Sequence, residues 1–246
     1  MKITLLGTGV AIPQAERFQS GLIVEGDSPV LFDCGCGVLQ RIYQSGYKHT
    51  EISSVFLTHL HLDHCGDLLA LIKANWLCDV INIQVYGPTG TRQWLDDLLA
   101  AYSYMQDKVD IQVTELTASQ VVKVEGLEIE CVKTIHMLPS LGFKVKTKGC
   151  SLLYTGDTEP GNEIIKACNG IDLLIHECSF PDSFDVTNHT TPKTLALKLE
   201  GVQVGKIILT HLYPQTQGFE HEMIQVVSDA CLCQVEIGYD LMVIEI

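Results

Sequence analysis

The sequence lacks the features that mark membrane proteins, disordered proteins and proteins that bind polyanions. No apolar run approaches the roughly 20 residues that a membrane-spanning helix needs, and no Pro-, Ser- or Gly-rich stretch is long enough to form a linker. Lys and Arg number only 16 against 30 Asp and Glu, without a basic cluster, so the formal net charge of −14 opposes binding to nucleic acids. We therefore expect neither membrane association nor an extended nucleic-acid surface.

Two short sequence patterns are also missing. The apolar residues 3–6 could begin a signal peptide, but Gly7 and Gly9 follow and there is no small-residue cleavage site. We expect a first strand there, and a cytoplasmic protein. Ten cysteines are present, but the two close pairs have one residue between the partners, whereas redox and zinc-ribbon motifs have two. We expect the cysteines to pack as small apolar side chains.

The sequence does contain enough apolar material for a large core. With 246 residues and 46% hydrophobic composition, the chain is expected to form one domain, residues 1–246. Short apolar runs predict strands at 3–6, 22–24, 30–32, 55–58, 83–86, 127–131, 143–145, 152–154, 173–175, 207–210 and 242–246. Helical spacing predicts helices at 67–76, 91–104, 163–168, 192–199 and 220–230. The early strands form a meander and the later ones alternate with helices, which favours an α/β fold with two sheets between helical layers.

Four metal-binding side chains follow the apolar strand at 55–57 within six residues. They are His59, His61, Asp63 and His64. In a loop that leaves a strand, the first two histidines can face one ion while the aspartate and the last histidine face a second. The spacing therefore suits two ions about 3.5–4 Å apart.

A site of this kind needs further ligands, and three candidates stand at the ends of other predicted strands: His136, Asp157 and His211. Imidazole and carboxylate groups suit zinc, and also iron or manganese. The residue types thus predict two divalent metal ions without selecting the metal. We expect zinc, with manganese and iron as alternatives.

The series His-x-His-x-Asp-His, a lone His, Thr-Gly-Asp and Leu-Thr-His resembles, in this order, the motifs of the metallo-β-lactamase superfamily. The resemblance implies a four-layer αβ/βα fold with two mixed sheets between helices. It also implies that His59, His61 and His136 bind one ion and that Asp157 bridges the two. The ligands of the second ion would be Asp63, His64 and His211.

Further segments are similar to the ribonuclease Z-like group of phosphodiesterases. They are Gly7-Thr8-Gly9 after the first strand, Leu31-Phe32-Asp33-Cys34-Gly35, His176-Glu177-Cys178-Ser179 and Asn188-His189-Thr190-Thr191. The resemblance implies that His189 is a proton donor or phosphate contact beside the metals and that Glu177 orients it. A carboxylate neighbour fixes the tautomer of an imidazole and stabilises its cationic form. As a hypothesis, Asp63 orients the attacking water and His189 protonates the leaving oxygen.

Two departures from that group point to a substrate smaller than tRNA. Members that process tRNA carry a Gly/Pro- and Lys-rich arm between the third and fourth motifs, but the segment between His136 and Asp157 holds only two strands and a turn. The strongly acidic balance of the chain argues the same way. As a third difference, the group has glycine where this chain has Leu62, a bulky residue that would narrow or line the pocket above the metals. The resemblance also allows a homodimer, because relatives in the group are commonly dimers.

These features predict a metal-dependent hydrolase, a phosphodiesterase without the tRNA arm that acts on a small phosphodiester. The same site could instead hydrolyse a lactone, ester, thioester or β-lactam, for which His189 would have no obvious duty. A metal-binding accessory protein without turnover is a third reading, which the complete ligand set disfavours. A flavodiiron electron carrier is disfavoured because its first motif has glutamate where this chain has His61.

Overall fold

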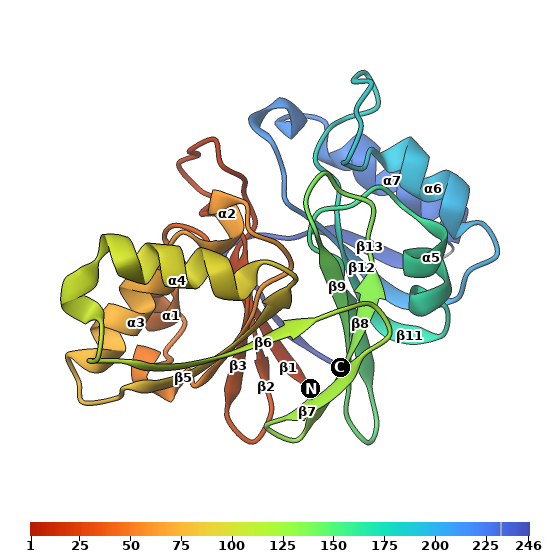
Figure 1. The fold of residues 1–246 in the computed structure, drawn as a ribbon. Helices are drawn as coiled ribbons and strands as arrows, with labels where there is room; N and C mark the ends of the chain where they lie inside the picture. The colour runs from red at the N-terminus through yellow and green to blue at the C-terminus, as the bar shows by residue number, and fades with distance from the viewer. Residues whose placement is uncertain (232) are drawn as a thin grey trace.

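The computed structural model describes residues 1–231 and 233–246. Within them, two seven-stranded sheets face each other (Figure 1). The first sheet has the order β14 (Val243–Glu245), β1 (Lys2–Gly7), β2 (Gly21–Glu25), β3 (Pro29–Phe32), β4 (Ser54–Phe56), β5 (Asn82–Pro88) and β6 (Asp110–Leu116). The second has the order β13 (Gln234–Ile237), β12 (Val204–Thr210), β11 (Ile171–Glu177), β10 (Ser151–Tyr154), β9 (Leu141–Lys146), β8 (Leu127–Lys133) and β7 (Val121–Val124).

Both sheets have the same internal plan. In the first, the pairs from β14 to β3 are antiparallel and the pairs from β3 to β6 are parallel. In the second, the pairs from β7 to β10 are antiparallel and the pairs from β10 to β13 are parallel. The expected order of an early meander and a later alternation therefore occurs once in each half of the chain. Helices connect most of the parallel strands, as crossover geometry requires.

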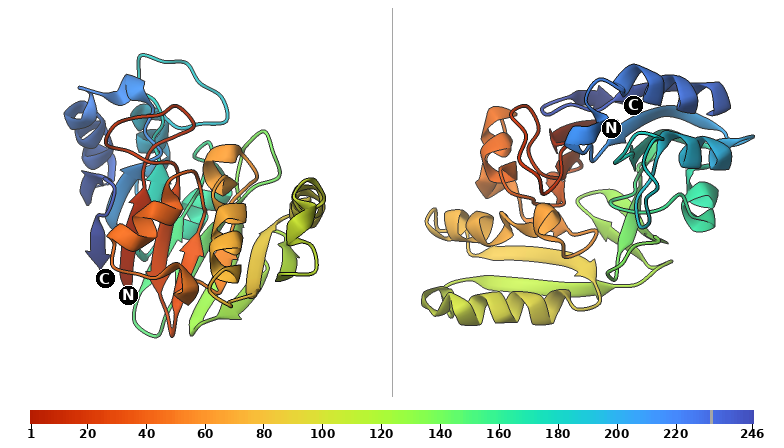
Figure 2. Two further views of the ribbon diagram at one scale, coloured as in Figure 1. Left: turned by 90° about the vertical axis from the view of Figure 1, so that its left-hand side faces the viewer. Right: turned by 90° about the horizontal axis from the view of Figure 1, so that it is seen from above.

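Helices cover the outer face of each sheet (Figure 2, right). Those of the first half are α1 (Val38–Gln44), α2 (Leu62–Cys65), α3 (Leu68–Trp76) and α4 (Thr91–Ala101), and those of the second are α5 (Asn162–Cys168), α6 (Pro192–Leu199) and α7 (Glu220–Cys231). Short 3-10 turns span His49–Glu51, Ser103–Met105 and Pro214–Thr216. The four-layer arrangement expected from the sequence is confirmed. Among the described helices, none combines the length and apolar composition that crossing a bilayer requires.

Three apolar cores hold these layers together. One lies between the sheets, and one lies between each sheet and its helices. The central core contains the fully buried rings of Phe32, Phe56 and Phe143, whose centroids lie 5.2–5.7 Å apart. Each ring contributes about 1.5–3 kcal/mol by leaving water. Because Phe32 and Phe56 end β3 and β4, this stack fixes the point at which the polar loops above it begin.

Three strands and two helices escape the sequence patterns. The missed strands β6, β7 and β13 are edge strands of their sheets, where most side chains are exposed or half-buried and no buried apolar run marks the strand. The missed helices are α1 and the four-residue α2. Helix α6 begins as expected at Pro192, and the Thr191 side chain caps it by accepting a hydrogen bond from the Thr194 backbone N–H.

Candidate metal centre

The carboxyl-terminal ends of strands from both sheets meet at one edge of the sandwich. The loop after β4 carries four of the expected ligands, and the ends of β8, β10 and β12 carry the other three. The structure brings all seven into two adjoining groups: His59, His61, Asp63, His64, His136, Asp157 and His211. Most are buried and two histidines are half-buried.

The first group contains His59, His61, His136 and Asp157, whose ligand atoms lie within 4.8 Å of one another. The Nδ1 atom of His61 lies 3.0 Å from His59 Nε2 and 3.2 Å from His136 Nε2. Three imidazole nitrogens from two loops therefore converge on one point. This is the set that the sequence assigned to the first ion.

The second group contains Asp63, His64 and His211, again within 4.8 Å. The two histidine Nε2 atoms are 3.3 Å apart, and each lies 3.2 Å from Asp157 Oδ1. The other oxygen of Asp157 lies 3.7 Å from His59 Nε2. Asp157 therefore stands between the two groups, where a bridging carboxylate would stand.

Neighbouring side chains fix the tautomers of these histidines. Buried Asp33 accepts hydrogen bonds from the Thr58 hydroxyl and from His64 Nδ1 at 2.7 Å, so His64 presents its Nε2 to the cluster. Because the Thr58 hydroxyl gives its proton to Asp33, it accepts one from His59 Nδ1 at 3.0 Å. In the same way His136 Nδ1 donates to the Asn188 carbonyl at 3.0 Å. Three Nε2 atoms are thereby turned inward. Burial lowers the pKa of His64, but the charges of Asp157 and Asp33 outweigh it and raise the pKa, so a metal ion would displace a proton from this Nε2.

The fourth such histidine, His211, donates from Nδ1 to the Ser179 hydroxyl at 3.0 Å, while that hydroxyl donates to Glu177 at 2.5 Å. Asp33 and Ser179 were given no role from the sequence. Asp33 had a signal, since it is an acid directly after an apolar strand. Ser179 had none.

The arrangement fits divalent metal ions. Converging lone pairs at 3.0–3.3 Å repel one another unless a cation lies between them. Asp157 Oδ1 is also buried without a hydrogen bond, because the two nearby imidazoles approach it outside hydrogen-bonding geometry. Burial lowers the pKa of His59 and keeps it in the neutral form that binds metals. Burial opposes ionisation of Asp63, but the neighbouring imidazoles of His211 and His64 outweigh it and lower the pKa of this carboxyl.

A second buried carboxylate, Glu177, ends strand β11 beside this centre. Its oxygens accept hydrogen bonds from the backbone N–H groups of Thr158 and Thr190 and from His189 Nδ1 at 3.0 Å. Burial lowers the pKa of His189, but the hydrogen bond and charge of Glu177 outweigh it, so the pKa is raised. A ring nitrogen of His189 lies within 4.8 Å of ligand atoms of Asp157 and His211. Glu177 and His189, the pair expected from the sequence, are therefore in contact at the rim of the metal centre.

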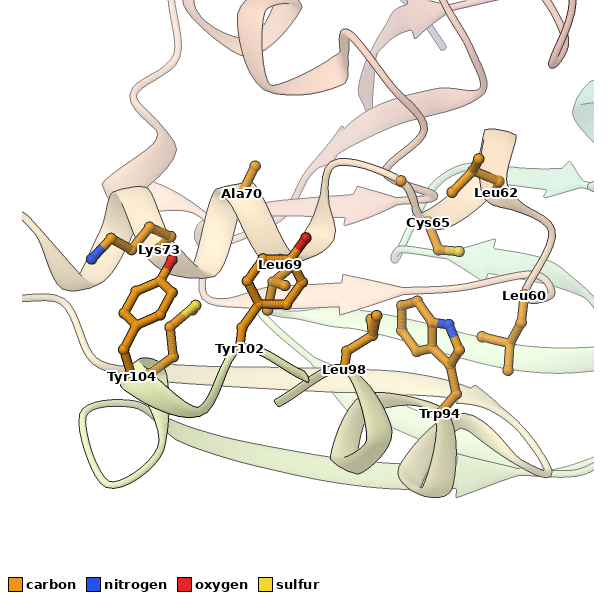
Figure 3. A pocket seen from close by; sticks show the side chains of 12 residues that line it. Leu60, Leu62, Cys65, Leu69, Ala70, Lys73, Trp94, Leu98, Tyr102 and Tyr104 are labelled. Atoms are coloured by element: carbon orange, nitrogen blue, oxygen red, sulfur yellow. The ribbon is translucent and has the colours of Figure 1, made fainter. Parts of the chain in front are cut away.

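Leucines alternate with the ligands of the first motif. Leu60 and Leu62 line an apolar cavity of about 470 Å³ with Trp94, Leu98 and Tyr102 (Figure 3). Its lining includes none of the seven candidate ligands. Leu62 is 70% exposed, so its bulk lies at the surface beside the metal loop.

Comparisons with known proteins show the family to which the chain belongs. A family model described as anti-Pycsar protein Apyc1 matches residues 1–228. The chain belongs to the Apyc1 family. Ribonuclease Z of Mycolicibacterium gilvum is 30% identical over 270 residues, which cover 98% of this chain and 94% of the relative.

Two solved structures share the fold of this Apyc1 family member. The short form of human tRNase Z is 28% identical, with a TM-score of 0.81 and coverage of 100% of this chain and 99% of the other. YhfI of Bacillus subtilis, a metallo-β-lactamase fold protein, has a TM-score of 0.87 at 23% identity and covers 99% and 98%. The expected metal-dependent hydrolase of the metallo-β-lactamase fold, related to ribonuclease Z, is confirmed.

Proposed function

We propose that this Apyc1 family member is a two-zinc phosphodiesterase for a small phosphodiester. The first zinc is assigned to His59, His61 and His136, and the second to Asp63, His64 and His211, with Asp157 between them. Five imidazoles and two carboxylates form a donor set that zinc favours. The proposal includes the role that the family's description prints, that of an anti-Pycsar protein.

Bound divalent ions would lower the pKa of a water molecule and neutralise charge on the phosphoryl oxygens. Asp63 has an ionised carboxyl that can accept a hydrogen bond from the attacking water and orient it. His189 holds a proton at the rim of the site and can give it to the leaving oxygen. Glu177 fixes the orientation of that imidazole through its Nδ1.

The Glu177–His189 pair is the observation that carries the choice of bond. Glu177 is fully buried, is held by two backbone N–H groups and lies 3.0 Å from His189 Nδ1, so the imidazole is steadied in its protonated form. An alkoxide that leaves a phosphodiester needs a proton. The leaving group of a lactone or β-lactam needs a proton as well, so the preference for a phosphodiester is supported by the similarity of the segments that carry this pair to the ribonuclease Z-like phosphodiesterases.

The short β9–β10 connection supports a substrate smaller than tRNA. Only residues 147–150 join these two strands. The alignment with ribonuclease Z of M. gilvum extends over 270 positions, whereas this chain has 246 residues. The net charge of −14 adds long-range repulsion against a polyanion.

A homodimer, implied by the resemblance, is part of the same proposal, and light scattering on the metal-loaded protein tests it.

Metal analysis and a substrate panel test the proposal together. Protein purified without chelator should contain two zinc ions per chain by mass spectrometry. It should hydrolyse bis(p-nitrophenyl) phosphate and cyclic nucleotides faster than a homoserine lactone or nitrocefin. Zinc-loaded protein that turns over only the lactone or nitrocefin would overturn the phosphodiesterase, and protein that binds no metal would overturn the site.

A further inference from the structure

Three aromatic rings gather beside His189, outside the layers of the fold. Phe180 stacks on Tyr213, with centroids 4.3 Å apart and an interplanar angle of 27°, and Phe184 lies 5.6 Å from Phe180. None of the three belongs to the apolar cores that the described residues form. Phe184 is 41% exposed, and the other two rings are half-buried. We call Phe180, Phe184 and Tyr213 the aromatic wall.

The backbone builds this wall from the ends of two neighbouring strands. β11 and β12 are parallel, and their pairing continues past the sheet, where the Tyr213 N–H donates to the Ser179 carbonyl at 3.2 Å. That bond places Phe180 and Tyr213 side by side. Pro214 then begins a 3-10 turn, and the Tyr213 carbonyl accepts hydrogen bonds from the backbone and side chain of Thr216. The stack is therefore held by the same strand ends that carry Glu177 and His211.

The aromatic wall adjoins the reacting end of the site. The Tyr213 ring centroid is 5.8 Å from that of His189 and 6.0 Å from that of His211, in both cases nearly edge-on. Phe180 lies 6.2 Å from His189. A group attached to the oxygen that His189 protonates would therefore meet these rings first.

We infer that the aromatic wall binds the organic group of the substrate and selects phosphodiesters in which that group carries a flat unsaturated ring. The inference rests on the proposed function and extends it to substrate selectivity. Aromatic rings prefer offset-stacked or edge-to-face contacts with centroids about 4.5–7 Å apart, and these contacts are stronger than burial of the same area alone. A saturated ring of similar size gains the burial without the aromatic contact.

Two non-hydrolysable probes isolate this contact. Phenylphosphonate and cyclohexylphosphonate carry the same anion and differ in the ring. Calorimetry on the zinc-loaded protein should give a dissociation constant about tenfold lower for the phenyl compound. Phe180→Leu and Tyr213→Leu should reduce this preference to within about twofold.

Two matched variants serve as controls. Tyr213→Phe keeps the ring and should keep the preference, and Phe219→Leu makes the same change at a ring that is 41% exposed and lies outside the wall. Zinc content is measured for every variant, because Tyr213 lies close to His211 in the chain. Equal affinity of the wild type for both phosphonates, or an unchanged preference in both leucine variants, would overturn the inference. Absence of binding by either phosphonate would overturn the proposed function itself.

Discussion

The change of Asp33 to Asn tests how the first sheet prepares the metal centre. Asp33 is fully buried, and its φ of 57° lies in the left-handed region, which asparagine also tolerates. The substitution therefore changes charge and hydrogen bonding without adding backbone strain. The carboxylate accepts from the Thr58 backbone and hydroxyl, from His64 Nδ1 and from the Tyr154 hydroxyl.

An amide offers only one oxygen to these donors. If its NH₂ group faces Tyr154 and His64, two charge-assisted hydrogen bonds are lost, and His64 must move its proton to Nε2, where it blocks metal binding. If the amide faces the other way, the buried Thr58 N–H loses its acceptor. At about 1.5–3 kcal/mol for each charge-assisted bond, the free energy of unfolding should fall by roughly 3–6 kcal/mol in the first orientation and by roughly 1.5–3 kcal/mol in the second. Zinc affinity at the second position should fall about 10- to 100-fold.

Urea unfolding of the chelated protein and zinc titration measure the two effects separately. Tyr154→Phe is the matched control: it removes one donor, should cost about 1.5–3 kcal/mol and should leave zinc affinity within about twofold, because His64 keeps its acceptor. If Asp33→Asn binds two zinc ions with wild-type affinity, Asp33 does not set the tautomer of His64 and the argument fails.

Four further outcomes follow from the geometry. His189→Ala should keep both metal ions by mass spectrometry and lower kcat about 100- to 10,000-fold, and unchanged turnover at full occupancy would exclude His189 as the acid. The raised pKa of His189 keeps this proton donor charged to higher pH, so activity should decline as the pH rises through the pKa of His189. Glu177→Gln should move this decline in the pH–rate profile to lower pH, and a decline that does not move would contradict the coupling of Glu177 and His189. Gly156→Ala puts a Cβ 2.6 Å from Thr58 Cβ at a φ of +57°, so urea unfolding should show a loss of roughly 2–5 kcal/mol, and an unchanged midpoint would refute this packing. Chelation should lower the Tm by roughly 5–10 °C, reversibly with zinc, and His61→Ala should lose most of this response.

The sequence was informative where chemistry and burial coincide. The first motif places four ligands after one buried strand, and Asp157 and His211 also follow buried strands. In each case an apolar run is followed directly by polar side chains, and this contrast in the sequence marks both the strand and the candidate ligand. Edge strands lack this contrast. β6 alternates exposed and buried positions within polar surroundings, and only its parallel pairing with β5 defines it as a strand. Pairing between distant segments has no local signature.

The same limit explains the missed supporting residues. Ser179 matters because one hydroxyl links Glu177 to His211 across two strands, a contact that no spacing along the chain can reveal. The aromatic wall is equally non-local, since Phe180 and Tyr213 are brought together by a backbone bond between loops. The bulky Leu62 stands out in the sequence, but the direction of its side chain depends on the short helix α2. This helix has too few residues to show a periodic pattern from which the direction could be predicted.

The repeated plan of the two sheets divides the work of the site. The first sheet contributes Asp33 and the ligand loop after β4, which carries four of the seven candidate ligands. The second sheet contributes the other three candidate ligands, at the ends of β8, β10 and β12, and also Glu177, Ser179 and the aromatic wall. Substitutions on the first side should therefore lower the metal content and reduce activity toward every substrate alike. Substitutions at Glu177 or the aromatic wall should alter the preference among substrates while metal remains bound, so the bond cleaved and the group selected are determined by the second sheet.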